Sequence, residues 1–355
     1  MRNLLFQIVL IFFCIGAANA ESLKIGLIAP LTGTGSALGQ YVKKGTELSV
    51  TKAKENGVEI DLFVEDDNWD APKSISIAQR FISLKKVNAL LVVGSAIGNV
   101  IAPIAERNKI VMIAIGASDF NVVKNRTFSF THWITPEKEA ELLIKELISR
   151  RYSRIGLFGT EQEGVIAVVN AINSEAKKKN VSDLFKVEKY FLPNQTDFSS
   201  ALLKVKEEQL DALILCLFPE DLVTLVKQIK ALKINIPLIG VELFEDEHLI
   251  EATGDGLYGN WYVNADNPTP EFSKLFNDKY NEFPAWGTPN SYDAVSLIVE
   301  AYKNSNADTI KMAKYLSSIN NFSGALGVYS ASGDNRFNLP AAVKVVTKEG
   351  FIKIH

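Results

Sequence analysis

The loop at residues 33–39, Gly-Thr-Gly-Ser-Ala-Leu-Gly, has residue types that can hold a phosphate group. It lies between an apolar run and an amphipathic run, the strand–loop–helix order in which backbone N–H groups bind an anion. The acidic run at 65–67 is similar to the ribose-binding acid of dinucleotide sites. Because the loop has one residue too many before its last glycine, we favour a tight turn or a small-ligand loop instead.

Catalytic and metal-binding motifs are absent from the sequence. It has no G-x-S-x-G elbow, no H-E-x-x-H pair and no G-x-x-x-x-G-K-[ST] loop. His132, His248 and His355 do not have the spacing of metal ligands. We therefore expect no metal, no cofactor and no enzymatic activity. An exported enzyme that uses cleft carboxylates is the less favoured alternative.

Apolar runs of strand length alternate with longer amphipathic runs along most of the chain. Strands are expected at 24–29, 59–65, 88–94 and 110–115, and again at 154–159, 186–191, 211–218, 237–242 and 257–263. Strands that alternate with helices are typical of βαβ units and a mainly parallel sheet. The fold class is therefore α/β.

The alternating series is interrupted twice. The stretch THWITPEKEAELL at 131–143 restarts with a helix, and NADNPTP at 264–270 is a polar connector. We predict two lobes with the chain crossing between them more than once. Lobe I comprises 21–135 plus 267–331, and lobe II comprises 136–266 plus 332–355.

The first twenty residues have the three parts of a secretory signal peptide. Arg2 precedes an apolar stretch at 4–15, and Ala18-Asn19-Ala20 supplies small residues for cleavage. The stretch is shorter than the ~20 residues of a membrane span. A lipid anchor on Cys14 is disfavoured, because Phe13 stands where a small residue is expected. We predict cleavage after residue 20 and a periplasmic protein.

The charge and cysteine content limit the classes of partner and the covalent links that are expected. The formal charge of −3 becomes −4 when Arg2 is removed, and no basic patch stands out, so nucleic acid is not an expected partner. Cys216 is the one cysteine after residue 20, which excludes an intramolecular disulfide, and its apolar surroundings predict a buried side chain.

The ends of the predicted strands supply candidate binding groups, since ligands of open parallel sheets bind outside the carboxyl ends of the strands. The candidates in the first lobe are mostly small, hydroxyl or amide residues, and those in the second include two acids: Leu38, Ser95, Gly98, Asn99, Ala117 and Ser118, then Glu163, Phe218 and Glu242. These two groups of residues suit a zwitterion or an amine. N–H groups of the first lobe would bind its anionic end, and a carboxylate of the second lobe would bind its cationic end.

An ordered series of short stretches covers nearly the whole chain after residue 20. It includes IGLIAPLTG, VEDDNWDAPKSISIAQRFI, LLVVGSAIGNVIAPIAE, IGAS, TDFSSALLKVK, PNSYDAVSLIVEAY and FSGALGVYSASGD. The series resembles the periplasmic branched-chain amino-acid binding proteins of ABC transporters, which have the type I solute-binding architecture. The resemblance implies two Rossmann-like lobes, joined by three crossovers, that close on a ligand.

The resemblance also implies roles for individual residues. The Ala117 backbone and Ser118 match the family's loop for the ligand carboxylate, Glu242 matches the acid that holds the ammonium group, and Phe218 matches an aromatic ligand cover. Other positions depart from the family pattern. Gly98 replaces the carboxylate-binding serine, with Ser95 and Asn99 as substitutes, while Leu38 and Glu163 stand where aromatic residues are frequent. The ligand therefore does not follow from the resemblance.

Each candidate also has a purely structural alternative. Glu242 and Glu163 could be solvated acids, Ser118 a helix cap, and Phe218 a core residue. Trp69 and Trp286 could be cleft walls or packed side chains.

From these features we expect a monomeric periplasmic solute-binding protein. It would deliver a small amino acid or a related polar amine to an inner-membrane ABC permease. The alternative is a sensor of the same fold that reports to a receptor or regulator.

Overall fold

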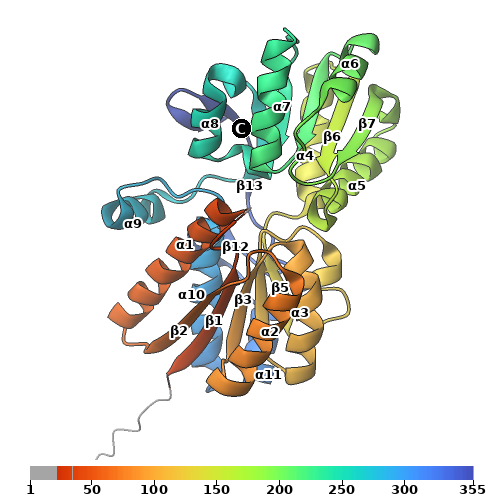
Figure 1. The fold of residues 1–355 in the computed structure, drawn as a ribbon. Helices are drawn as coiled ribbons and strands as arrows, with labels where there is room; N and C mark the ends of the chain where they lie inside the picture. Colours follow the sequence, from red (N-terminus) through yellow and green to blue (C-terminus); the bar gives the residue numbers. More distant parts are fainter. Residues whose placement is uncertain (1–21, 34, 355) are drawn as a thin grey trace, which may run out of the picture.

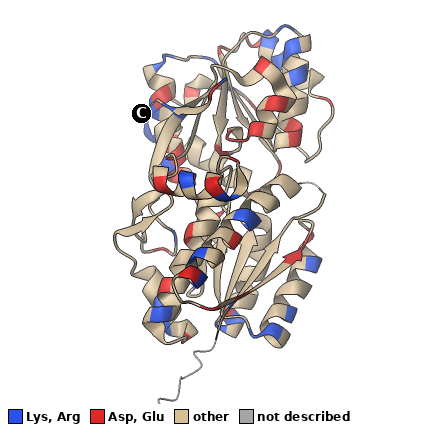
Figure 2. Cartoon of the chain, turned by 90° about the vertical axis from the view of Figure 1, so that its left-hand side faces the viewer, with Lys and Arg blue, Asp and Glu red and all other residues tan. Residues whose placement is uncertain are grey.

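The computed structural model describes residues 22–33 and 35–354 and consists of two α/β lobes, lower and upper in Figure 1. The predicted signal peptide lies outside the described residues. Within them, every helix is too short or too polar to span a bilayer. Figure 2 shows basic and acidic residues mixed along the ribbon of both lobes, in keeping with 38 Lys and Arg against 41 Asp and Glu.

Lobe I is built on a parallel five-stranded sheet of order β2-β1-β3-β4-β5. Its strands are β1 (Leu23–Ala29), β2 (Ile60–Asp66), β3 (Ala89–Val93), β4 (Val111–Ile115) and β5 (Ser129–His132). The covering helices are α1 (Ser36–Glu55), α2 (Ala71–Arg80), α3 (Ser95–Asn108), α10 (Thr288–Ser305) and α11 (Thr309–Ser317).

Both faces of the lobe I sheet are buried, which explains the continuous apolar runs. Alternate residues of β3 and β4 point to opposite faces. Leu91 and Ile113 pack with α1, α10 and α11, whereas Leu90 and Met112 pack with α2 and α3. A parallel sheet covered on both sides needs apolar residues at every strand position.

Lobe II is built on a seven-stranded sheet of order β14-β13-β10-β9-β8-β6-β7. The parallel strands are β6 (Ile155–Thr160), β7 (Phe185–Phe191), β8 (Ala212–Cys216), β9 (Leu238–Val241) and β10 (Trp261–Ala265). The antiparallel strands β13 (Ala341–Thr347) and β14 (Gly350–Lys353) complete one edge. One face packs on α4 (Pro136–Ser149) and α5 (Glu163–Lys178), and the other on α6 (Ser199–Glu207), α7 (Pro219–Ala231) and α8 (Glu247–Thr253).

The chain passes between the two sheets three times, after β5, after β10 and before β13. The second passage leads to α9 (Pro270–Tyr280), at the side of the waist in Figure 1, and later to the hairpin of β11 (Phe322–Gly324) and β12 (Gly327–Tyr329). The predicted two-lobed, mainly parallel α/β fold is confirmed. The residue limits proposed for the lobes remain a prediction.

Three strands, β5, β10 and β11, differ from expectation, and β11 was not predicted. β5 was not predicted, because FSFTHW has no long apolar run, yet all four of its residues are buried at the edge of the lobe I sheet. β10 begins at Trp261 instead of residue 257, because Gly254–Leu257 forms a 3-10 turn first.

The glycine loop allows close approach of the backbone to its neighbours. Gly35 has a φ of 78°, and a Cβ atom there would lie 2.4 Å from the Trp69 ring. A Cβ atom on Gly39 would lie 1.9 Å from the carbonyl oxygen of Pro30. Asp66, from the acidic run, accepts hydrogen bonds from the N–H groups of Leu31 and Thr32, just before the loop. These contacts support the tight-turn interpretation.

Candidate functional site

A cavity of about 320 Å³ lies where strand ends of the two sheets meet. Its lining comes from residues at or just after the carboxyl ends of β3, β4, β6, β7, β8 and β9, together with Leu38, Trp69 and Trp286. Its volume falls in the range of small-molecule sites. The cavity therefore lies where ligands of parallel sheets are expected to bind, outside the carboxyl ends of the strands.

Four of the nine predicted residues line this cavity. Leu38 and Ser118 come from lobe I, and Phe218 and Glu242 come from lobe II. Ser118 follows β4 by three residues, and Glu242 directly follows β9. The cavity therefore has one wall from each lobe.

The other five predicted residues lie outside the lining. Ser95 and Asn99 instead organise the loop that carries Ser118: the Ser95 hydroxyl oxygen accepts the N–H groups of Ser118 (3.0 Å) and Asp119 (3.1 Å), and the Asn99 amide donates to the Asp119 carboxylate (2.8 Å). The proposed substitutes for the missing serine thus shape a loop and do not face the cavity.

The three remaining positions are Gly98, Ala117 and Glu163. Gly98 packs on Val122, where an added Cβ atom would lie 3.0 Å from a methyl group. Ala117 belongs to the core cluster on the α2 and α3 side of the sheet. Glu163 begins α5 and lines a separate, wider cleft of about 1080 Å³.

The acidic wall of the cavity centres on Glu242. The Ser118 hydroxyl donates to its Oε1 atom at 2.8 Å, which joins the two lobes across the cavity. Burial raises the pKa of Glu242 to about 7, and the Ser118 hydroxyl and the nearby Trp133 indole oppose that shift. No ion pair to Glu242 is found within residues 22–33 and 35–354.

A second carboxyl group, Glu139, lies directly behind Glu242. It is fully buried, and its Oε1 atom accepts the backbone N–H of Glu242 at 3.2 Å. Burial, and then the charge of Glu242, raise the pKa of Glu139 well above its usual range. We did not single out this residue from the sequence, although a glutamate on the buried face of α4, between Pro136 and Leu143, is a recognisable signal.

Much of the cavity lining is apolar. Trp69 from lobe I and Phe218 from lobe II stack with ring centroids 5.5 Å apart, so an aromatic pair spans the two lobes. Trp286 and Val165 add further apolar surface. Cys216, a free and buried thiol as predicted, also lines the cavity, and burial raises its pKa, which disfavours a reactive thiolate.

The first turn of α3 gives the cavity a group of backbone donors. Gly94 precedes the helix with a φ of 82°, no side chain caps the helix start, and Gly94 and Ala96 line the cavity. In contrast, Gln162 caps α5 by accepting the N–H groups of Gly164 and Val165. The start of α3 therefore combines N–H groups that lack intrahelical partners with the positive end of the helix dipole.

Contacts at the rim also join the lobes. The Tyr41 hydroxyl of α1 donates to the buried Asp246 carboxylate at 3.1 Å, and the Tyr41 ring stacks on His248 with centroids 6.4 Å apart. Together with the Ser118–Glu242 bond, these contacts describe a closed arrangement.

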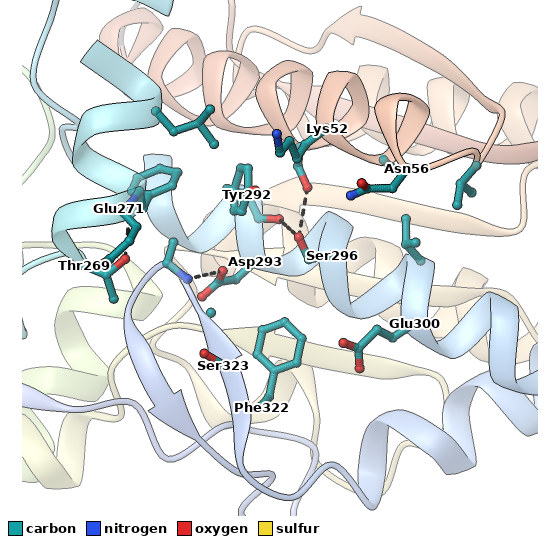
Figure 3. A pocket seen from close by; sticks show the side chains of 18 of the residues that line it. Lys52, Asn56, Thr269, Glu271, Tyr292, Asp293, Ser296, Glu300, Phe322 and Ser323 are labelled. Atoms are coloured by element: carbon teal, nitrogen blue, oxygen red, sulfur yellow. Dashed lines mark hydrogen bonds between the residues drawn. The ribbon is translucent and has the colours of Figure 1, made fainter. Parts of the chain in front are cut away.

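Lobe I has a second, larger pocket of about 510 Å³ between α1, α9, α10 and the β11–β12 hairpin (Figure 3). Its buried acid, Asp293, accepts the N–H groups of Ala325 and Leu326 at 2.6 and 3.4 Å and the Tyr329 hydroxyl at 2.9 Å. Because these donors belong to the hairpin region, Asp293 anchors the hairpin on α10. We therefore place the functional site in the interlobe cavity.

Within the described part of the chain, no group of His, Cys, Asp and Glu side chains is arranged to hold a metal ion. The interlobe cavity presents one carboxylate wall, one set of helix N–H groups and an apolar surface. These groups can bind a small molecule by its charges and its apolar part, and they do not form a recognisable catalytic constellation.

Comparison with known proteins agrees with this geometry. Residues 22–350 match the family model described as periplasmic binding protein. The Leu/Ile/Val-binding protein BraC3 of Rhizobium johnstonii is 24% identical over 79% of this chain and 78% of its own. The leucine binding protein LivK of Thermotoga maritima superposes with a TM-score of 0.86 at 22% identity, covering 94% of this chain and 98% of its own.

A solute-binding protein of an ABC transporter from R. palustris, solved in complex with benzoate, has the same fold. It superposes with a TM-score of 0.85 at 18% identity, covering 94% of this chain and 95% of its own. Proteins of this fold thus bind chemically different ligands. With its family match over most of the chain, its two lobes and its interlobe cavity, the chain belongs to the type I periplasmic binding proteins of the branched-chain amino-acid family.

Proposed function

We propose that this protein is the periplasmic solute-binding component of an ABC importer. It captures a small amino acid or a related amine between its lobes and delivers it to the inner-membrane permease. The observation that carries this proposal is the cavity itself, where Glu242 on one wall faces a lobe I wall that includes the uncapped start of α3.

Each part of an apolar amino acid has a matching surface in the cavity. The ammonium group pairs with the Glu242 carboxylate, the carboxylate group lies near the first N–H groups of α3, and the side chain packs on Trp69 and Phe218. Of the nine predicted site residues, we retain Leu38, Ser118, Phe218 and Glu242 as ligand contacts.

An aromatic acid such as the benzoate of the R. palustris relative suits this cavity less well. The described residues that line it include Glu242 and no Lys, Arg or His. An anion placed beside Glu242 would be repelled, whereas an ammonium ion would be attracted. The charge of the lining therefore favours a ligand with an amino group.

A matched ligand series tests the proposal. L-leucine carries both charged groups, isopentylamine lacks the carboxylate, and 4-methylpentanoate lacks the amine. We expect leucine and isopentylamine to raise the melting temperature, because both can pair with Glu242, and 4-methylpentanoate to leave it unchanged. Stabilisation by 4-methylpentanoate or benzoate, with none by either amine, would contradict the proposed ligand class.

The delivery step has a separate test. The mature protein, without residues 1–20, is expected to be a monomer that adds to a membrane-embedded permease–ATPase complex. Ligand-loaded protein should stimulate ATP hydrolysis by that complex more than ligand-free protein does. Equal rates with both forms would argue for a sensor.

A further inference from the structure

The acid behind the cavity, Glu139, has too few partners for a buried carboxylate. Its side chain is fully buried on α4, and its Oε2 atom has no hydrogen-bond partner among the described residues. Its Oε1 atom has one, the backbone N–H of Glu242. An ionised carboxylate in this position would be strongly destabilised, since buried charges need a counter-charge or several donors.

The groups around the two acids do not supply a counter-charge. The Ser118 hydroxyl reaches Glu242 from lobe I, the Trp133 indole lies nearby, and the Cys216 thiol faces both acids from the end of β8. These groups are neutral in their ordinary protonation states.

The lysine of the adjoining hydrogen-bond network is already paired. Lys344 of β13 contacts both carboxylate oxygens of Glu245, at 3.0 and 2.9 Å. Glu245 also accepts the side-chain amide of Asn264, and that amide reaches the carbonyl oxygen of Glu242 at 3.4 Å. The Lys344–Glu245 pair is neutral as a unit, so it leaves the charge of the two cavity acids uncompensated.

Two carboxyl groups that share a desolvated place do not both ionise near neutral pH, because each charge raises the pKa of the other group. Burial raises the pKa of both groups, and the charge of Glu242 raises the pKa of Glu139 further. The empty cavity therefore keeps at least one proton on the pair. An entering ammonium ion provides the positive charge that the surroundings lack.

We propose that Glu139 is a second acid of the ligand site, which shares a proton with Glu242 in the empty cavity and releases it when a ligand ammonium ion binds. This inference rests on the proposed function. In the exchange, one carboxyl O–H bond breaks, the proton passes to solvent, and an N–H donor of the ligand takes its place at the carboxylate. One positive charge enters and one leaves. Glu139 is a positioning residue in this scheme, since Glu242 contacts the ligand.

Isothermal titration calorimetry measures the exchange directly. The probe is whichever of L-leucine and isopentylamine binds more tightly, titrated at pH 8 in buffers of different ionisation enthalpy. We expect about one proton released per ligand, and a Kd that rises by up to roughly tenfold for each pH unit below neutrality. Glu139→Gln keeps the size of the side chain and an acceptor for the Glu242 N–H, and it should release less than half as much proton and show a flatter pH profile.

A matched control is available on the same helix. Glu146 is also buried on α4, but it pairs with Arg150 at 3.0 Å and does not line the cavity. Glu146→Gln should leave proton release as in the wild type. If Glu139→Gln does not fold, infrared difference spectra of the wild type provide the test, because the band of a protonated carboxyl group should disappear when ligand binds.

The possible outcomes separate the two proposals. If neither amine binds, the proposed function fails. If an amine binds without proton release or loss of the carboxyl band, or if Glu139→Gln releases as much proton as the wild type, the role of Glu139 is overturned.

Discussion

Two fully buried acids, Asp293 in lobe I and Glu139 in lobe II, are used in different ways. Asp293 accepts two backbone N–H groups and the Tyr329 hydroxyl, all from the segment that it anchors. Glu139 accepts one N–H group, from Glu242, and its other oxygen has no partner among the described residues. An acid that finds its donors within its own lobe stabilises the fold, whereas an acid that lacks them behind a cavity can respond to the charge of a bound ligand.

The largest expected effect is on binding and comes from Glu242→Gln. Removing one partner of a buried charge pair costs about 2–5 kcal/mol, so affinity for an amine ligand should fall by about thirtyfold to a few thousandfold. Calorimetry gives the affinity, and a cooperative thermal melting transition should show that the empty variant is folded. Glu247→Gln, which removes an exposed acid of α8, is the control and should bind normally. Unchanged affinity in Glu242→Gln would remove this residue from the site.

Asp293→Ala should show the opposite pattern. It leaves two buried N–H groups and a buried hydroxyl without their acceptor, so the free energy of unfolding should fall by about 2–4 kcal/mol. Urea unfolding measures this loss, and Asp293→Asn, which keeps an acceptor, should lose less. The Kd of the folded protein should change by less than about threefold. A large loss of affinity with little loss of stability would break the distinction between the two acids.

A pH profile sharpens the comparison. Because the pKa of Glu242 is raised to about 7 from an ordinary 4.5, the folded chain holds a proton that the unfolded chain releases, and this stabilisation is lost as pH rises from about 5 to 8. We subtract the unfolding free energy of empty Glu242→Gln from that of the empty wild type at each pH. This difference should fall by up to about 3 kcal/mol as pH rises over that range. A difference that does not change with pH would count against the raised pKa of Glu242.

The variant is needed as a reference because another buried group opposes the effect. Burial lowers the pKa of His132 to about 3, so this group makes the fold more stable as pH rises from about 3 toward its ordinary value of 6.5. The contribution of His132 is the same in the wild type and in Glu242→Gln, so it cancels when the two unfolding free energies are subtracted.

The smallest expected effect concerns Asp246, whose side-chain partners include one from the other lobe. Tyr41→Phe removes that hydroxyl donor, which is present only when the lobes are closed. The loss of one hydrogen bond of about 0.5–1.5 kcal/mol should weaken ligand binding by about three- to tenfold and leave the unfolding of the ligand-free open form nearly unchanged. Fluorescence titration measures the affinity. A variant that binds as tightly as the wild type would show that the rim contact does not stabilise closure.

The fold could be predicted because both sheets follow simple patterns. Strands buried on both faces need continuous apolar runs, as in LLVV of β3 and ALILC of β8, and these runs locate the strands and their carboxyl ends. Cavity residues that directly follow a strand, such as Glu242 after β9, could be found in this way. β5 was missed because a four-residue edge strand with Ser, Thr and His has no such run.

Residues inside a helix or loop were predicted less well, because a strand end does not determine which way the next side chains point. Ser95 and Asn99 turn toward the 117–119 loop as α3 winds away from the cavity. Glu139 was missed because it lies far in sequence from any strand end, and only the packing of α4 brings it behind Glu242. The aromatic pair Trp69 and Phe218 likewise depends on how the two lobes meet.

The threefold passage of the chain between the sheets also affects how the protein folds. The core of lobe I joins β1 at the start of the chain to α10, α11 and Leu339, and the core of lobe II includes Val343 and Val346 of β13. Neither core can be completed before nearly the whole polypeptide is available. Contacts so distant in sequence make folding slow. A newly made chain therefore completes neither half until late in its synthesis.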